Sequence, residues 1–177
     1  MMITHENLIR LLNMDLELEM TVVMRYINHA AMLTGDAYRN IKNTLHAFAW
    51  QEIEHAMILA EQICYFGGYP NMRATYVYTS EDNEEMLWYD FDEKKDTIQR
   101  YTMRIEQAEQ LEEVELSKRL RTILRVEQQH VMYLKKQVCA REKQGDGSNI
   151  PTIDACDFSQ LWAERAAKVP IRIKNQN

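Results

Sequence analysis

The chain has few of the residues that interrupt helices or crosslink a fold. Only five glycines and three prolines occur among its 177 residues, so few positions can end a helix. The three cysteines, Cys64, Cys139 and Cys156, are far apart and include no Cys-x-x-Cys pair. This spacing argues against a disulfide framework, and it favours buried thiols in a reducing compartment.

Long apolar runs and basic runs are also missing. No stretch approaches the roughly 18 consecutive apolar residues of a membrane span, and the first residues lack the features of a secretory signal. The net charge of −6 is spread along the chain, which disfavours nucleic acid phosphates and favours cations. We therefore expect a soluble, cytoplasmic protein that has neither a membrane nor a nucleic acid partner.

Helical periodicity is present in four long stretches, which predicts an all-α fold. With 46% apolar residues, a chain of this length can bury a substantial core. The expected helices run from Thr4 as N-cap to Gly35, from Asp36 to Gly67, from near Ser80 to about Gln110, and from roughly Glu115 to Glu142.

The connections between these helices predict a bundle with one long crossover. Residues 67–80 have no helical period and exceed the usual length of a link between neighbouring antiparallel helices. Helices three and four are joined by a tight turn around Glu112 and Glu113. We expect a four-helix bundle over residues 1–145 and an extension with a short amphipathic helix over residues 146–177.

Two Glu-x-x-His motifs carry the main chemical signal. The second helix contains Glu52 and His55 in WQEIEHAM, and the fourth contains Glu127 and His130 in RVEQQHVM. Residues three apart share a helix face, and both pairs fall on the stripe that should be buried. Glu19 lies on the corresponding stripe of the first helix. Because buried carboxylates are costly unless paired or bound to metal, this set predicts a metal site, best suited to iron or manganese.

The order and spacing of these motifs resemble the bacterioferritins over about residues 5–143. The resemblance includes Glu19 followed by Tyr26, the second-helix motif followed by CYFGGYPN, the stretch EEMLWYD and the motif in ILRVEQQH. It implies a ferritin-like bundle that oxidises ferrous iron with dioxygen or peroxide and stores it in a homo-oligomeric shell of twelve or twenty-four subunits. It also implies that Glu19 and His55 hold one metal ion, that His130 holds a second, that Glu52 and Glu127 bridge them, and that Tyr26 orients the ligands.

The chain departs from this family at two positions. The family's haem-binding methionine is replaced by Ile53, so we expect no haem. The inward stripe of the third helix passes through Lys94, where the family has a glutamate ligand. Asp90 points more nearly toward the site than Glu93 does, but it lies one helical turn before position 94. Glu93 lies at the right position along the helix axis but points about 100° away from the direction of Lys94.

Lys94 leaves several alternatives open. One metal ion could be lost or weakened, Glu93 could replace the ligand at a local bulge, or the ammonium could stand where a metal cation would. The side chain could also extend out of the bundle, away from the core. We therefore expect one or two iron ions per chain, with manganese as the other candidate metal.

Two further functions follow from these alternatives. The chain could be a ferritin-like oxidase or oxygenase that acts on an organic substrate, with Lys94 altering the second metal site. It could also be a relative that binds no metal, with the lysine as its cation. Four methionines at helical spacing are interpreted as core residues: Met20, Met24, Met57 and Met132.

Overall fold

The computed structural model describes the backbone of residues 3–145 and the side chains of residues 3–140. Contacts divide the chain into a compact unit over Met1–Val138 and a second over Cys139–Asn177. Every residue of the candidate site lies in the first unit. The short helix predicted within residues 146–177 lies outside the described residues.

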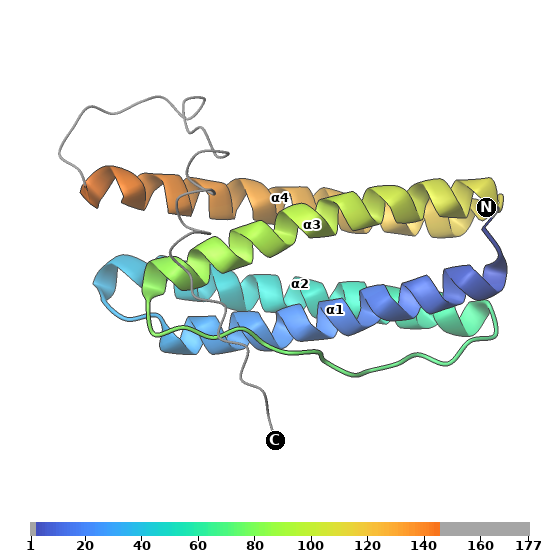
Figure 1. Ribbon diagram of the computed structural model, residues 1–177, viewed down its shortest axis with the longest axis horizontal. Helices are drawn as coiled ribbons and strands as arrows, with labels where there is room; N and C mark the ends of the chain where they lie inside the picture. Colours follow the sequence, from blue (N-terminus) through green and yellow to red (C-terminus); the bar gives the residue numbers. More distant parts are fainter. Residues whose placement is uncertain (1–2, 146–177) are drawn as a thin grey trace, which may run out of the picture. The chain divides into compact units, whose positions relative to one another are not determined.

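Four α-helices make up the described part of the chain, and no strand occurs there, which confirms the predicted all-α fold. They are α1 (His5–Met32), α2 (Arg39–Tyr65), α3 (Asn83–Gln110) and α4 (Val114–Gly145), with a 3-10 turn, η1 (Asp36–Tyr38), before α2. Figure 1 shows α1 antiparallel to α2, and α3 antiparallel to α4. None of the described helices is both long enough and apolar enough to span a bilayer.

Local sequence signals set the helix ends. Thr4 caps α1 as predicted, because its hydroxyl accepts from the Asn7 backbone N–H at 3.2 Å. The predicted Asp36 cap of the second helix is replaced by η1, so α2 begins three residues later and has no side-chain cap. Similarly, α3 begins at Asn83 instead of Ser80, because Asp82 accepts from the first backbone N–H groups of that helix.

The glycine pair after α2 ends that helix. Gly67 has a φ of 80°, in the left-handed region that glycine adopts without strain. The Gly68 N–H donates to the Ile63 carbonyl and the Gly67 N–H donates to the Cys64 carbonyl, both at 2.9 Å. These bonds satisfy two carbonyls of the last helical turn and direct the chain into the crossover.

The crossover between α2 and α3 runs along the bundle, as predicted (Figure 1). Side chains of α1 hold its backbone in place. The Asn71 N–H donates to the Asn13 side chain and the Thr75 N–H donates to the Thr21 hydroxyl, each at 2.7 Å. Near α3, a ring nitrogen of His29 lies 3.0 Å from the Tyr78 carbonyl oxygen. This anchoring lets α3 start at the same end of the bundle as α2.

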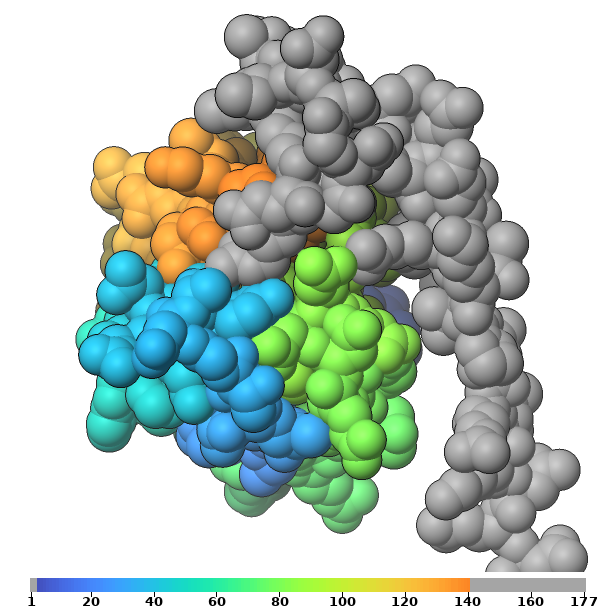
Figure 2. All heavy atoms as spheres, turned by 90° about the vertical axis from the view of Figure 1, so that its left-hand side faces the viewer, coloured from blue at the N-terminus to red at the C-terminus, as the bar shows by residue number. Residues whose placement is uncertain are grey.

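The same end of the bundle is closed by contacts between the end of α1 and the start of α3. Asn83 and Thr34 exchange two hydrogen bonds, of 2.9 and 3.1 Å. Figure 2 looks onto this end and shows the blue end of α1, the cyan start of α2 and the green start of α3 gathered there. The helices are therefore fixed relative to one another on this side of the site.

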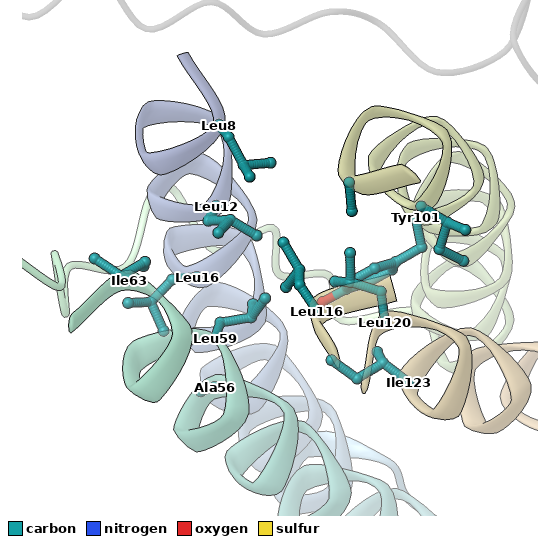
Figure 3. Close-up of a cluster of buried hydrophobic side chains, with 12 residues drawn as sticks. Leu8, Leu12, Leu16, Ala56, Leu59, Ile63, Tyr101, Leu116, Leu120 and Ile123 are labelled. Carbon is teal, nitrogen blue, oxygen red and sulfur yellow. The ribbon is translucent and has the colours of Figure 1, made fainter. Parts of the chain in front are cut away.

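An apolar core fills the other half of the bundle. Leucines of α1 and α4 meet α2 and α3 there (Figure 3). The Tyr101 ring belongs to this core, although its hydroxyl points to the polar centre. The buried cluster comprises Leu8, Leu12, Leu16, Ala56, Leu59, Ile63, Tyr101, Ile105, Ala108, Leu116, Leu120 and Ile123.

Three of the four methionines interpreted as core residues are not in the core. Met24, Met57 and Met132 are 49%, 54% and 72% exposed, whereas Met20 packs against the apolar cluster. The prediction of buried thiols also fails at Cys64, which is exposed, and holds at Cys139. Met57 lies two residues after His55, which places the two side chains about 200° apart on α2.

Candidate functional site

All four helices contribute to one buried polar cluster in the middle of the bundle. The Glu-x-x-His motifs project inward because each begins on the buried stripe of its helix and places a second group one turn later. Every member is between 0% and 4% exposed. The cluster consists of Glu19 of α1, Glu52 and His55 of α2, Lys94 of α3, and Glu127 and His130 of α4.

His55 lies among three carboxylates. Its Nδ1 atom is 3.0 Å from Glu127 Oε1, 3.2 Å from Glu52 Oε2 and 3.7 Å from Glu19 Oε2. One ligand atom from each of these four residues lies within 4.8 Å of every other. Such a compact set of one imidazole and three carboxylates is the donor chemistry that iron and manganese prefer.

The three carboxylates also have free capacity for a cation. Glu19 Oε2 and Glu127 Oε1 are buried without a hydrogen-bond partner. Buried polar atoms are normally satisfied, so two buried oxygens that accept no hydrogen bond and face the same His55 nitrogen offer lone pairs to a bound cation. The four residues therefore fit one metal ion, which Glu19, Glu52, His55 and Glu127 would hold.

Lys94 reaches the cluster from α3. Its Nζ atom donates to Glu52 Oε1 and to Glu127 Oε2, each at 2.5 Å, and the side chain is 0% exposed. The alternative in which the lysine extends out of the bundle is therefore wrong. The ammonium joins the two glutamates of the Glu-x-x-His motifs, which come from different helices.

The two acidic neighbours of Lys94 are held elsewhere. Asp90 accepts from Arg25 Nε at 2.8 Å through one oxygen, and its other oxygen lies 2.9 Å from His29 Nδ1. The Glu93 carboxylate is 35% exposed and lies 3.6 Å from Arg25 Nη1. Neither carboxylate replaces the missing ligand, because Arg25 of α1 pairs with both.

The lysine charge controls the ionisation of its partners. Burial opposes ionisation of Glu52 and Glu127, but the Lys94 ammonium and the two histidines of the cluster together outweigh burial and lower each pKa to about 2. Burial also opposes protonation of Lys94, yet the charges of the two glutamates raise its pKa well above the ordinary value.

The pKa values of Glu19 and His55 are both raised. Burial and the negative charge of Glu52 raise the pKa of Glu19. For His55, burial disfavours the charged imidazole, but the surrounding carboxylates of Glu127, Glu19 and Glu52 raise the pKa to about 11. A metal ion at His55 Nδ1 requires the imidazole to be neutral, so the ion would take the place of a proton.

His130 lies on the lysine side of the cluster. Its Nδ1 atom is 3.1 Å from Glu52 Oε1, the oxygen that Lys94 also contacts. Its Nε2 atom is 2.7 Å from Gln51 Oε1, and its ring stacks on Phe48 with centroids 3.7 Å apart. The structure does not bring His130 into the group whose ligand atoms lie within 4.8 Å of one another.

Two tyrosines border the cluster with different roles. Tyr26 is fully buried and its ring centroid is 5.6 Å from Lys94 Nζ, but its hydroxyl has no hydrogen-bond partner among the described residues. Tyr101 instead donates to Glu19 Oε1 at 2.5 Å. Tyr101 is a site residue that the sequence did not single out, although it follows Lys94 by seven residues on the same inward stripe.

Comparisons with known proteins agree with this fold. A model of the ferritin-like domain family matches residues 9–140. A bacterioferritin from Streptomyces coelicolor is 26% identical over 82% of this chain and 87% of its own length. The structure of a Bacillus anthracis protein described as a ferritin-like, diiron-carboxylate protein is 33% identical, with a TM-score of 0.73 over 76% of this chain and 96% of that one. The bacterioferritin of Desulfovibrio desulfuricans, which is 22% identical, shares the fold with a TM-score of 0.75 over 81% of this chain and 84% of that one.

Proposed function

We propose that this chain, which belongs to the ferritin-like domain family, binds ferrous iron inside its bundle and oxidises it. The observation that carries the proposal is the group formed by Glu19, Glu52, His55 and Glu127, whose ligand atoms lie within 4.8 Å of one another. All four side chains are buried, so an ion held by them would be shielded from water.

The proposed reaction treats iron as substrate. Each ferrous ion gives up one electron and becomes ferric, and dioxygen that receives two electrons and two protons becomes hydrogen peroxide. Peroxide that receives two electrons and two protons becomes two molecules of water. Three carboxylates in a low-dielectric interior stabilise the higher ferric charge more than the ferrous charge, which favours oxidation.

We further propose that the oxidised iron is stored or detoxified in a large homo-oligomer of twelve or twenty-four subunits. The similarity to a bacterioferritin over 82% of the chain supports this assembly. Exposed apolar side chains also occur on the outer face of α2, where Trp50 and Met57 are 69% and 54% exposed and lie seven residues apart. Clustered exposed apolar side chains often mark protein interfaces. Light scattering that gives a monomer or dimer would contradict the shell.

The test of iron oxidation compares two histidine variants of α2. His55→Ala removes a member of the cluster, whereas His46→Ala removes an exposed histidine on the same helix. Anaerobic Fe²⁺ is added to each protein, air is admitted, and ferric absorbance is followed. We expect the His46 variant to match the unmodified protein and the His55 variant to oxidise iron no faster than buffer. Equal rates in the two variants would refute the proposal.

A second candidate function is oxidation of an organic substrate by a metal-dependent oxidase or oxygenase. The observation that favours it is the Lys94 ammonium inside the cluster, 2.5 Å from two carboxylates. Such an enzyme would retain its iron or manganese through many turnovers. Dioxygen uptake with no net release of ferric iron would favour this candidate over the ferroxidase.

A further inference from the structure

We propose that the Lys94 side chain takes the place of a second metal ion in the cluster, so that the site binds one divalent metal ion on its His55 side instead of two. This inference rests on the proposed function, because it assumes that the cluster binds a metal. It lowers the expected metal content from two ions to one. It also means that the histidine of the α2 motif holds the ion and the histidine of the α4 motif does not.

The position of the ammonium supports the first step. Lys94 Nζ lies between Glu52 Oε1 and Glu127 Oε2, which belong to the two carboxylates that would bridge a metal pair. Each of these oxygens is already within 2.5 Å of a cation. A second metal ion would need the same oxygens and would lie beside a positive charge in a buried site.

The neighbouring helices supply no substitute ligand. Asp90 is paired with Arg25 and His29, and it is 0% exposed, so it is fixed away from the cluster. Glu93 lies near Arg25 at the edge of the bundle. The described part of α3 therefore gives the cluster an ammonium and no carboxylate.

The charges of the cluster balance with one ion. A two-metal site of this architecture has four glutamates, whose four negative charges match two divalent cations. Here Glu19, Glu52 and Glu127 supply three negative charges and Lys94 supplies one positive charge, so one divalent cation makes the cluster neutral. A second divalent cation would leave two uncompensated positive charges in the interior, which is strongly unfavourable.

The free oxygens place that single ion on the His55 side. Glu19 Oε2 and Glu127 Oε1 have no hydrogen-bond partner, and both face His55 Nδ1, at 3.7 and 3.0 Å. The second oxygen of Glu19 is occupied by the Tyr101 hydroxyl. His130 faces Glu52 Oε1 instead, beside the ammonium. The geometry thus gives His55 and His130 different roles.

Anaerobic titration with Co²⁺, followed by equilibrium dialysis and metal analysis, tests the inference without oxidation of the metal. The full-length protein is expected to bind one Co²⁺ per chain, His55→Ala none, and His130→Ala one. Two Co²⁺ per chain in the unmodified protein would overturn the inference and leave the proposed function intact. No Co²⁺ would overturn the proposed function itself, and loss of the ion in the His130 variant would overturn its assignment to the His55 side.

Charge reversal at Lys94 gives a second measurement. Lys94→Glu restores four carboxylates, so we expect its Co²⁺ content to rise from one to two per chain. The matched control is Lys95→Glu, because Lys95 is the next residue, is 44% exposed and pairs with Asp92. This control should still bind one Co²⁺. A single Co²⁺ in folded Lys94→Glu would contradict the charge argument, and the three measurements above remain decisive if that variant does not fold.

Discussion

Removal of the Lys94 charge should strongly destabilise the metal-free protein. In Lys94→Met, the side chain keeps most of its volume but loses the ammonium that separates two buried carboxylates. Both glutamate oxygens are 2.5 Å from Nζ, so they lie no more than about 5 Å apart. The variant therefore leaves two like charges facing each other at short range, each without its nearest counter-ion.

The size of the effect follows from this geometry. Two unit charges at about 5 Å repel by roughly 3 kcal/mol at an effective dielectric constant of about 20. Removal of one partner from a buried ion pair costs about 3–5 kcal/mol in general, which agrees with that value. At about 2–4 °C for each kcal/mol in a protein of this size, the midpoint of thermal unfolding should fall by roughly 6–20 °C.

The assay is thermal unfolding followed by circular dichroism, first in EDTA and then with excess Mn²⁺. Lys95→Met serves as the control, and a surface change of this kind should alter stability by less than about 0.5 kcal/mol. Mn²⁺ should raise the midpoint of Lys94→Met more than that of the unmodified protein, because the metal supplies the missing positive charge. An ion present at 100 times its dissociation constant stabilises by about 2.7 kcal/mol.

Two results would refute this reasoning. If Lys94→Met and Lys95→Met unfold at the same temperature in EDTA, then the ammonium does not hold the two carboxylates. If the loss of stability in Lys94→Met is the same at pH 8 and pH 5, then charge repulsion is not its cause. Protonation of one carboxylate at the lower pH should relieve the repulsion and reduce the difference.

Three further predictions concern the metal-free protein. Tyr101→Phe removes a hydrogen bond to the buried Glu19 carboxylate and should cost about 1.5–3 kcal/mol in urea unfolding; an unchanged midpoint would show that this bond contributes nothing. Stability measured against pH in EDTA should fall on both sides of a maximum near pH 5–6. The contribution of Glu52 is complete above its ordinary pKa of 4.5 and is lost as the pH falls through about 2. The contribution of His55 is complete below 6.5 and is lost as the pH rises through about 11, so a His55→Ala variant that keeps the full alkaline decline would contradict the assignment. Gly68→Ala would place a Cβ atom 2.5 Å from an isoleucine methyl group, so it should lower stability by about 1–3 kcal/mol in the same urea assay, and equal stability would show that the contact relaxes freely.

The helices and their inward faces could be predicted because they depend on local periodicity. The stripe of α1 that carries Glu19 follows the helical period through Leu8, Leu12, Asp15 and Tyr26, and all five side chains are buried. The Glu-x-x-His motifs share this property, since residues three apart lie on one helix face in any straight helix. The convergence of Glu52 and Glu127 therefore followed from two local patterns and the direction of each helix.

The errors have a physical cause as well. Methionine composition favoured a core position for Met57, but its angle on α2 relative to His55 places it on the opposite face, and it is 54% exposed. Angular position thus outweighs residue type on an amphipathic helix. The α2 start was misplaced because the 3-10 turn at Asp36–Tyr38 takes up the first residues of the expected helix.

The sequence pattern could not predict which side chains on different helices contact each other. The Tyr101 hydroxyl reaches Glu19, 82 residues earlier in the chain, and no periodicity within α3 selects that partner. The same holds for Asp90, which periodicity placed near the site but which Arg25 and His29 of α1 hold elsewhere. The register between helices decides which of several inward polar groups contact one another. This register depends on the packing of the whole core.

Lys94 shows why family membership does not determine the chemistry of this site. A sequence motif identifies ligand positions, but the metal content of a buried cluster depends on its total charge. Exchange of one glutamate for lysine changes that charge by two, which is the charge of one divalent cation. On the one-ion site that we propose, the five other cluster positions and the bundle stay the same while the metal content falls from two ions to one. A single side chain on α3 can thus alter function on an unchanged scaffold, because function resides in the site and the fold only positions it.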